Sequence, residues 1–380
     1  MNFIKVCEPD ARLFRQWLHS VRVLAGLGLA VLLVPAPGAQ SAGYDWQLPA
    51  WIKPPPVPSG NPMSRVKVEL GRRLFYDIRL SGPGYMACAS CHDPRRAFTD
   101  GRRVAIGATG ERHSLNSPSV VNAGYQGALT WADPGVQFLE KQARTPLFRT
   151  GPVEMGATGH EVQIINHLKY NSVYADLFGR AFPKTGGRID FDTITKALAS
   201  FQRTLISATS AYDTYRFGND TAALSLAAKR GERLFFSPRL RCGQCHNGLH
   251  LSDAIPHPAY HNTGLHNADG NGGLPPGVKG LIDKTGQPGD MGRFRTPSLR
   301  NVAVTDPYMH DGSIADLDAV ISHYAAGGEA ARLGRRSPLT SARVRGFSIT
   351  PEERRDLRAF LDSLTDNRFL RDPRHQTPFR

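Results

Sequence analysis

The chain has 380 residues, of which 40% are hydrophobic and 21% charged, and its formal net charge is +14. This composition excludes wholesale disorder, because the apolar content is large enough to build packed cores, and the length allows two domains. The positive charge favours acidic partners, but no zinc-finger spacing or RNP-type aromatic motif accompanies it, so we expect no nucleic-acid partner.

The N-terminal residues have the pattern of a signal peptide. A basic region is followed by an apolar run of 12 residues (23–34) and by small residues over 36–42. A bilayer-spanning helix needs roughly 20 residues, so we predict export to the periplasm and removal of residues 1–42, with no stable membrane span afterwards. Cleavage after Ala39 and an uncleaved anchor are the alternatives. The leader contains four basic and two acidic residues, so its removal leaves a net charge of +12.

A repeated segment divides the rest of the chain into two parts. GRRLFYDIRL at residues 71–80 is similar to GERLFFSPRL at residues 231–240, and each copy is typical of a helix with an apolar stripe. Each copy is followed by a C-x-x-C-H group. Such internal similarity is the signature of a duplicated unit, so we predict two related domains, residues 43–213 and 214–380.

Other segments also follow the helical period, and few segments alternate between apolar and polar residues as strands do. A capping box of Thr350 and Glu353, with Pro351 at the first helical position, opens the last of these helices. We therefore predict a mainly α fold. The other predicted helices cover residues 161–182, 191–205 and 317–324.

The two C-x-x-C-H groups are the strongest chemical signal in the sequence. Two thiols three residues apart can each form a thioether to a porphyrin vinyl group, which places the next residue's imidazole beneath the iron. A single group would also suit a redox or zinc pair, but two groups, each after the same repeat, predict two cytochrome c-like domains with covalently bound haem c. The attachment and axial residues are Cys88, Cys91 and His92 in the first domain and Cys242, Cys245 and His246 in the second.

Longer motifs surround these groups: CASCHDPRRAFTDG, LNSPSVVNAGY, LTWADPGVQFLEKQARTPLFRTGPVEMG and FRTPSLRNVAVTDPYMHDGSIADLDAVISHY. With them, the chain resembles the dihaem cytochrome c peroxidase and MauG superfamily over nearly all of its length beyond the leader. Within this superfamily it looks most like the MbnH-like enzymes of methanobactin operons, because of the TWADP string and the longer loop between QARTPLF and PVEMG. The resemblance implies an oxidoreductase that uses hydrogen peroxide.

The resemblance also implies catalytic residues. Glu154 falls on the acidic residue of the family's peroxide pocket, and Gln142 falls on its glutamine neighbour. A carboxylate near the iron can take a proton from the near peroxide oxygen and deliver it to the leaving oxygen. Trp131 matches the tryptophan set between the two haems, where its ring can carry charge. Without the family pattern, Glu154 would be interpreted as a surface charge and Trp131 as a core residue.

The axial ligand of the second haem decides much of its chemistry. Tyr324 matches the position at which the family's peroxidases carry a methionine ligand and MauG carries a tyrosine. A phenolate stabilises oxidised iron and lowers its potential, whereas a thioether raises the potential. From the spacing alone, Met309 and Met291 compete with Tyr324 for this role.

Two further expectations follow from the resemblance. Ala108, in IGATG, stands where bacterial peroxidases carry a histidine that blocks the first haem, so this haem should be open at rest, with His113 as a nearby residue that could still block it. Asn122, Thr305 and Pro307 match the family's calcium ligands between the haems, and oxygen donors suit this hard cation.

The expected function is that of a periplasmic MauG/MbnH-like enzyme. Peroxide reacts at the haem of the N-terminal domain, the C-terminal domain carries a low-spin haem that stores electrons, and a high-valent state is shared between both haems. By resemblance, this state oxidises a residue, a tryptophan, of an MbnP-like copper-binding partner. The alternative is a peroxidase fed by a small cytochrome or cupredoxin. A third hypothesis is an electron carrier with two six-coordinate haems, which would leave Glu154 without a task.

Overall fold

The computed structural model describes residues 44–379, and the predicted signal peptide at residues 1–42 lies outside them. Helices are the main regular secondary structure of the described residues, and the two strands, β1 (Tyr260–His261) and β2 (Phe294–Arg295), are only two residues long and antiparallel. The prediction of a mainly α fold is confirmed. The α-helices of the N-terminal half are α1 (Arg65–Tyr76), α2 (Leu139–Gln142), α3 (Arg144–Phe148), α4 (Glu161–Lys169), α5 (Ser172–Ala181) and α6 (Phe191–Arg203). Those that follow are α7 (Ala211–Arg216), α8 (Leu226–Phe235), α9 (Ile282–Thr285), α10 (Leu317–Ala325), α11 (Glu329–Arg332), α12 (Pro351–Asp362) and α13 (Asn367–Leu370).

The predicted helices are found with small changes. The capping box of Thr350 and Glu353 opens α12. The single helix predicted over residues 161–182 is wrong, because the structure has two helices there, α4 and α5. The break is at Asn171, whose side chain accepts hydrogen bonds from the backbone N–H groups of Val173 and Tyr174 and so caps a new helix.

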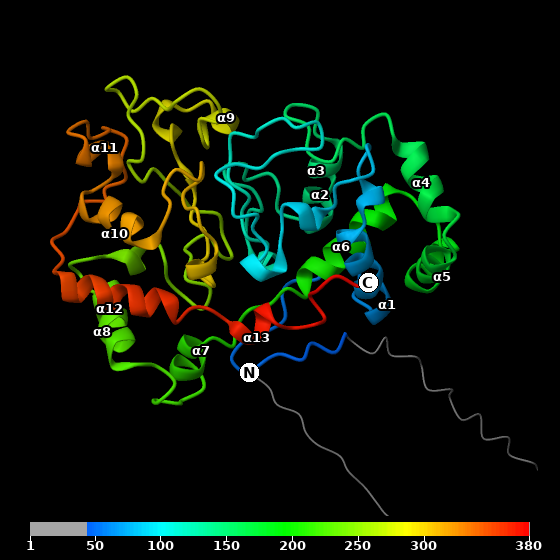
Figure 1. Ribbon diagram of the computed structural model, residues 1–380, viewed down its shortest axis with the longest axis horizontal. Coiled ribbons are helices and arrows are strands. Elements are labelled where there is room, and N and C mark those ends of the chain that lie inside the picture. The colour runs from blue at the N-terminus through cyan, green and yellow to red at the C-terminus, as the bar shows by residue number, and fades with distance from the viewer. Residues whose placement is uncertain (1–43, 380) are drawn as a thin grey trace, which may run out of the picture. The chain divides into compact units, whose positions relative to one another are not determined.

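Two helix crossings, α1 with α6 and α8 with α12, support the two haem-attachment segments (Figure 1). At each crossing a glycine lets the two backbones meet. A Cβ atom at Gly71 would collide with the carbonyl oxygen of Ala197, and one at Gly231 would collide with that of Asp356. The close approach needs a residue without a side chain. In each half, this contact between helix backbones lies among aromatic side chains.

The aromatic contacts at the two crossings correspond to each other. The Phe75 ring lies 5.3 Å from that of Phe201 and 6.3 Å from that of His92. In the second half, the Phe235 ring lies 5.0 Å from that of Phe360 and 6.4 Å from the His246 ring. The aromatic rings at each crossing therefore form the surface against which the attachment histidine packs.

The chain crosses between the halves twice, and the two crossing segments are bonded to each other. The Ser207 hydroxyl donates to the Asp366 carboxylate (3.1 Å), and the Thr209 N–H donates to the same carboxylate (2.8 Å). The side chain of Asn301 joins both segments, because it donates to the Ser207 hydroxyl (3.0 Å) and accepts the Asp366 N–H (2.7 Å). Asn122 accepts the Ser207 N–H (2.9 Å). These groups are buried or nearly so, so water does not compete for their hydrogen bonds.

The end of the chain returns to the N-terminal half. In Figure 1 the red C-terminal segment runs beside α1, and the Tyr76 hydroxyl donates to the carbonyl of His375 (2.5 Å). Phe369 belongs to the core of the first half. The predicted boundary between residues 213 and 214 lies inside α7, where Asp213 forms a fully buried ion pair with Arg300 (2.7 Å). Residues 44–379 accordingly lie in one compact unit.

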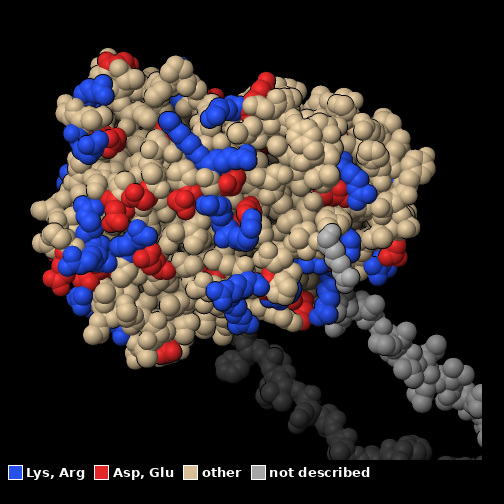
Figure 2. Space-filling view, in the orientation of Figure 1, with Lys and Arg blue, Asp and Glu red and all other residues tan. Residues whose placement is uncertain are grey.

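The surface charges do not gather into one field on the face drawn in Figure 2, where basic and acidic side chains are interspersed. Several are paired along helices, such as Arg73 with Glu69 and Arg358 with Asp362. Exposed pairs of this kind add little stability. Within residues 44–379, no helix is long and apolar enough to cross a membrane.

Replacing Gly71 or Gly231 by alanine should lower the free energy of unfolding by about 1–3 kcal/mol, because the added methyl group forces the paired helices apart. Gly179 in α5 is the matched control, since a Cβ atom there meets nothing within 4 Å. Gly179→Ala should be neutral or stabilising by up to about 1 kcal/mol. Urea unfolding of the haem-loaded proteins measures all three, and equal stabilities for Gly71→Ala and Gly179→Ala would contradict the packing argument.

Candidate active site

The first attachment segment presents its histidine in a defined orientation. Cys88–Ser90 forms a 3-10 turn, and the backbone N–H of His92 donates to the carbonyl of Cys88 (3.0 Å). The His92 Nδ1 atom lies 2.8 Å from the carbonyl oxygen of Phe98, which is reached because Phe98 has a positive φ of 62°. A donor bond at Nδ1 leaves Nε2 free as a ligand and fixes the ring plane.

The second segment repeats this arrangement. The His246 Nδ1 atom lies 3.1 Å from the carbonyl oxygen of Leu251, whose φ is also positive at 51°. Burial lowers the pKa of both histidines, so each imidazole is in the neutral form that binds a metal.

The thiols and cavities also fit haem c. All four cysteines of the attachment motifs are unpaired, and burial raises the pKa of Cys88 and that of Cys242 to about 12. Each set lines a cavity that is open to solvent, with a volume of about 210 Å³ beside His92 and about 260 Å³ beside His246. Each cavity thus brings the attachment cysteines and their histidine to one apolar surface, as the binding of haem c requires.

The first cavity contains the expected acidic residue. Glu154 and Gln142 both line it, together with His113 and Arg149. The backbone N–H of Ala108 donates to the carbonyl of Glu154 (2.7 Å), which fixes the IGATG loop against the PVEMG segment. Burial raises the pKa of Glu154, and the electrostatic interactions with His113 and Arg149 oppose this shift. A carboxyl group with a raised pKa is suited to both accepting and donating a proton.

Trp131 lies in a wall that the two cavities share. It is 9% exposed, it lines both cavities, and its indole N–H donates to the carbonyl of Asn116 (2.8 Å). Arg295 holds the same segment from the second half, because its backbone N–H donates to the Trp131 carbonyl (2.8 Å) and its Nε–H donates to that of Thr130 (3.0 Å). The Trp131 side chain thus lies next to both predicted haem sites.

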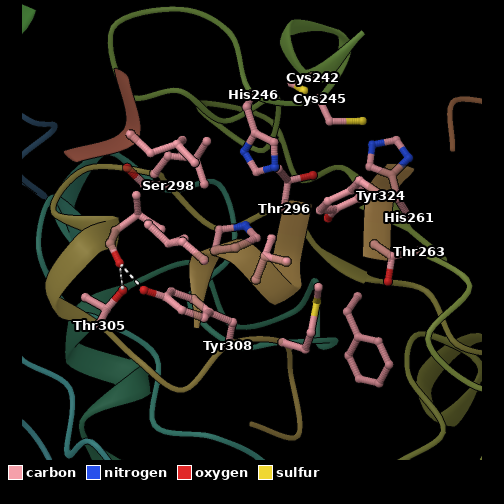
Figure 3. A pocket seen from close by; sticks show the side chains of 18 of the residues that line it. Cys242, Cys245, His246, His261, Thr263, Thr296, Ser298, Thr305, Tyr308 and Tyr324 are labelled. Atoms are coloured by element: carbon pink, nitrogen blue, oxygen red, sulfur yellow. Dashed lines mark hydrogen bonds between the residues drawn. The ribbon is translucent and has the colours of Figure 1, made fainter. Parts of the chain in front are cut away.

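The second cavity is lined by two of the three ligand candidates that the sequence offers besides its attachment histidine. Tyr324 and Met309 both line it, whereas Met291 is absent from its lining. In Figure 3, His246 and Tyr324 extend into the same pocket. Burial raises the pKa of Tyr324, so its hydroxyl keeps its proton unless a cation replaces that proton.

The three predicted calcium ligands do not line one surface. Thr305 and Pro307 line the second cavity. The Asn122 side chain is bonded on both sides to the backbone of Ser207, with its amide donating to the carbonyl (2.9 Å) and its oxygen accepting the N–H (2.9 Å). Asn116, and not Asn122, lines that cavity with Thr305 and Pro307. The calcium site stays a prediction.

Comparisons with known proteins agree with this geometry. The family model for di-haem cytochrome c peroxidase matches residues 65–221. The chain is 37% identical to the methylamine utilization protein MauG of Methylorubrum extorquens over 81% of each chain. It is 33% identical to cytochrome c551 peroxidase of Pseudomonas aeruginosa, covering 90% of this chain and 92% of that one. The crystal structure of a MauG-like protein associated with microbial copper homeostasis is 44% identical, with a TM-score of 0.85 over 88% of this chain and 99% of that chain.

The chain belongs to the di-haem cytochrome c peroxidase and MauG family. It is therefore a haem-dependent oxidoreductase of the peroxidase type, with two haem groups as its cofactors.

Sequence reasoning missed two residues of this family site. Arg149 reaches the Glu154 carboxylate (3.6 Å), and Arg295 lines both cavities although no ion pair with a carboxylate is found for it among the described residues. Burial lowers the pKa of Arg295 to about 10. Both arginines lie inside the quoted family motifs, but nothing in their local spacing distinguishes them from surface arginines.

Replacing Glu154 by glutamine should slow the reaction with hydrogen peroxide by about 10²- to 10⁴-fold, because glutamine cannot accept the proton. The raised pKa fixes the sign of the pH dependence. The wild-type rate should fall as the pH drops through the pKa of Glu154, which lies above the usual pKa of glutamate, because the carboxyl group then holds its proton and cannot accept another. Stopped-flow absorbance at the Soret band measures both effects. A Glu154→Gln variant with the wild-type rate and pH profile would remove Glu154 from this role.

Proposed function

We propose that the protein is a periplasmic MauG-like enzyme of the MbnH type, which uses hydrogen peroxide to oxidise a tryptophan of an MbnP-like copper-binding partner. The observation that carries the proposal is the wall shared by the two cavities, in which Trp131 touches both. Such a wall suits an enzyme that spreads an oxidation over two centres. The 44% identity to a MauG-like protein associated with microbial copper homeostasis supports the choice of partner.

The proposed roles follow the two cavities. When bound, the haems supply the redox chemistry, and His92 and His246 supply an imidazole to each. Glu154, with Gln142 beside it, accepts and returns a proton in the first cavity. Ala108 has only a methyl side chain, so it cannot act as a ligand.

Across the shared wall, Trp131 is the residue through which charge passes between the cavities. We assign Tyr324 as the residue that would bind the iron of a haem in the second cavity. Its phenolate would give that haem a low reduction potential. Asn122, Thr305 and Pro307 remain the proposed calcium ligands, and Asn116 is a further candidate because it lines the cavity with Thr305 and Pro307.

We further infer that residues 43–213 and 214–380 are two copies of one haem-binding unit. The corresponding features that support this are the glycine contacts of Gly71 and Gly231 and the positive φ angles of Phe98 and Leu251. These positive φ angles direct the carbonyl groups of Phe98 and Leu251 toward the Nδ1 atoms of His92 and His246. The predicted signal peptide, residues 1–42, would deliver the chain to the periplasm, where haem c is attached.

The second candidate function is a peroxidase that reduces hydrogen peroxide with electrons from a small cytochrome or cupredoxin. Two observations favour it. The chain is 33% identical to cytochrome c551 peroxidase, and Met309, a residue type that raises haem potential, lines the second cavity.

A pair of variants decides the ligand. Tyr324→Phe should convert the second haem from low to high spin and raise its reduction potential, whereas Met309→Leu should change neither. Electron paramagnetic resonance of the oxidised proteins and a redox titration measure these effects. The reverse result, with Met309→Leu losing the low-spin signal and Tyr324→Phe keeping it, would favour the peroxidase.

The partner reaction is tested directly with purified haem-loaded protein, hydrogen peroxide and a copper-binding partner encoded beside a methanobactin-type gene cluster. Intact-mass spectrometry should find oxygen added to a tryptophan of the partner only when both peroxide and enzyme are present. The Trp131→Phe variant should react with peroxide but modify the partner at least about tenfold more slowly. Rapid oxidation of a reduced small cytochrome, with no change in the partner's mass, would overturn the proposal in favour of the second candidate.

A further inference from the structure

His113 is a buried histidine of the first cavity that the proposed function does not use. It ends a short hairpin in which Ile106 pairs with Arg112, and its backbone N–H donates to the carbonyl of Ala105 (2.9 Å). Its side chain is only 9% exposed and lines the cavity beside the His92 attachment site. The backbone of its hairpin is therefore fixed independently of the ring.

The two ring nitrogens of His113 have different surroundings. Nδ1 lies 3.9 Å from an Oε1 atom of Glu154, and Nη1 of Arg149 lies 3.6 Å from the same oxygen. Nε2 is buried and has no hydrogen-bond partner among the described residues. Because buried polar atoms are nearly always bonded, an unpaired nitrogen on a side chain that lines a cavity points to a polar molecule beside that side chain.

Other buried histidines help to exclude a purely structural role. His92, His246 and His375 each direct a ring nitrogen at a backbone carbonyl within 3.3 Å. His250 and His323 also have ring nitrogens without partners, but neither lines either of the two cavities. Among these histidines, His113 alone combines an unpaired nitrogen with a place in the cavity wall where peroxide would react.

We propose that His113 is a second proton-accepting catalytic residue, acting beside Glu154 on hydrogen peroxide in the first cavity. The inference rests on the proposed reaction of peroxide there. Hydrogen peroxide would give one proton to the imidazole of His113, and this proton would return to the far oxygen as the O–O bond breaks, so that this oxygen leaves as water. His113 is neither oxidised nor reduced, because the bound haems would supply the two electrons.

The surrounding charges suit this transfer. The Glu154 carboxylate lies next to Nδ1 and stabilises the ring while it carries the extra proton. The guanidinium group of Arg149 lies on the other side of that carboxylate and favours negative charge developing on the leaving oxygen. The other charged side chain in the cavity wall is Arg295, and Glu111 and Arg112 on the same hairpin are exposed to solvent.

The test compares His113→Gln with a matched control. His167→Gln changes an exposed histidine of α4 in the same half of the molecule. In stopped-flow experiments, His113→Gln should react with hydrogen peroxide about 10²- to 10⁴-fold more slowly than the wild type. His167→Gln should match the wild type. Binding of hydrogen cyanide, which must also lose a proton, should slow in the same variant.

Two spectra keep the result interpretable. Haem content and the Soret band establish that His113→Gln is assembled. If His113→Gln does not assemble, His113→Asn, whose amide can overlay Nδ1, takes its place in the test. The high-spin signal of the resting oxidised protein should be the same in wild type and variant. A high-spin signal that appears only after the substitution would overturn the proposal, because His113 would then be an iron ligand.

Unchanged peroxide and cyanide kinetics in His113→Gln would also overturn the inference, while leaving the proposed function intact. A wild-type protein that is inert to peroxide would overturn both.

Discussion

The structure depends on two places where helices touch backbone to backbone. At Gly71 and Gly231 no side chain separates the crossing helices, and this close approach brings Phe201 against Phe75 and Phe360 against Phe235. The aromatic rings in turn support the attachment histidines. A side chain at either glycine would displace these aromatic rings, and with them the attachment histidine that packs against them. Helix packing beneath the attachment histidines would thus help to orient a bound haem, together with the thioether bonds that the attachment cysteines would form.

The two cavities are built alike on the side of the attachment histidine and differently on the opposite side. In the first, Glu154 and His113 are the groups that we propose move protons, and Arg149 lies beside the Glu154 carboxylate. In the second, Tyr324 and Met309 are side chains of types that can bind iron, and none of the described residues that line it is acidic. The proposed function assigns bond cleavage in the oxidant to the first cavity and storage of charge to the second. Trp131 and Arg295 line both cavities.

Sequence could predict the local features of this molecule, because they depend on neighbouring residues. The capping box at Thr350, the helices after each repeat and the attachment motifs all follow from short spacings. The break at Asn171 was also visible in principle, since asparagine is a strong helix cap, but the apolar periodicity continues across it.

The remaining features depend on contacts between distant residues. Asn116, Trp131 and Arg295 meet in one wall although Arg295 is far along the chain from the other two, and no local period reports that. The return of Phe369 to the first core is hidden for the same reason, and residues 44–379 lie in one compact unit. The two related domains predicted from the repeat stay a prediction. His113 could be placed near the first haem from the family motif, but only the structure gives the directions of its two nitrogens.

The paired crossing segments around Ser207 and Asp366 have a consequence for long-range electron transfer. A hinge between the halves would have to bend both segments together and break the buried hydrogen bonds of Asn301 and Thr209. Bending is therefore unfavourable, and the distance between the two cavities should be nearly constant. Because tunnelling rates depend steeply on distance, the electron exchange that we propose between the two cavities should not be gated by motion of one half against the other.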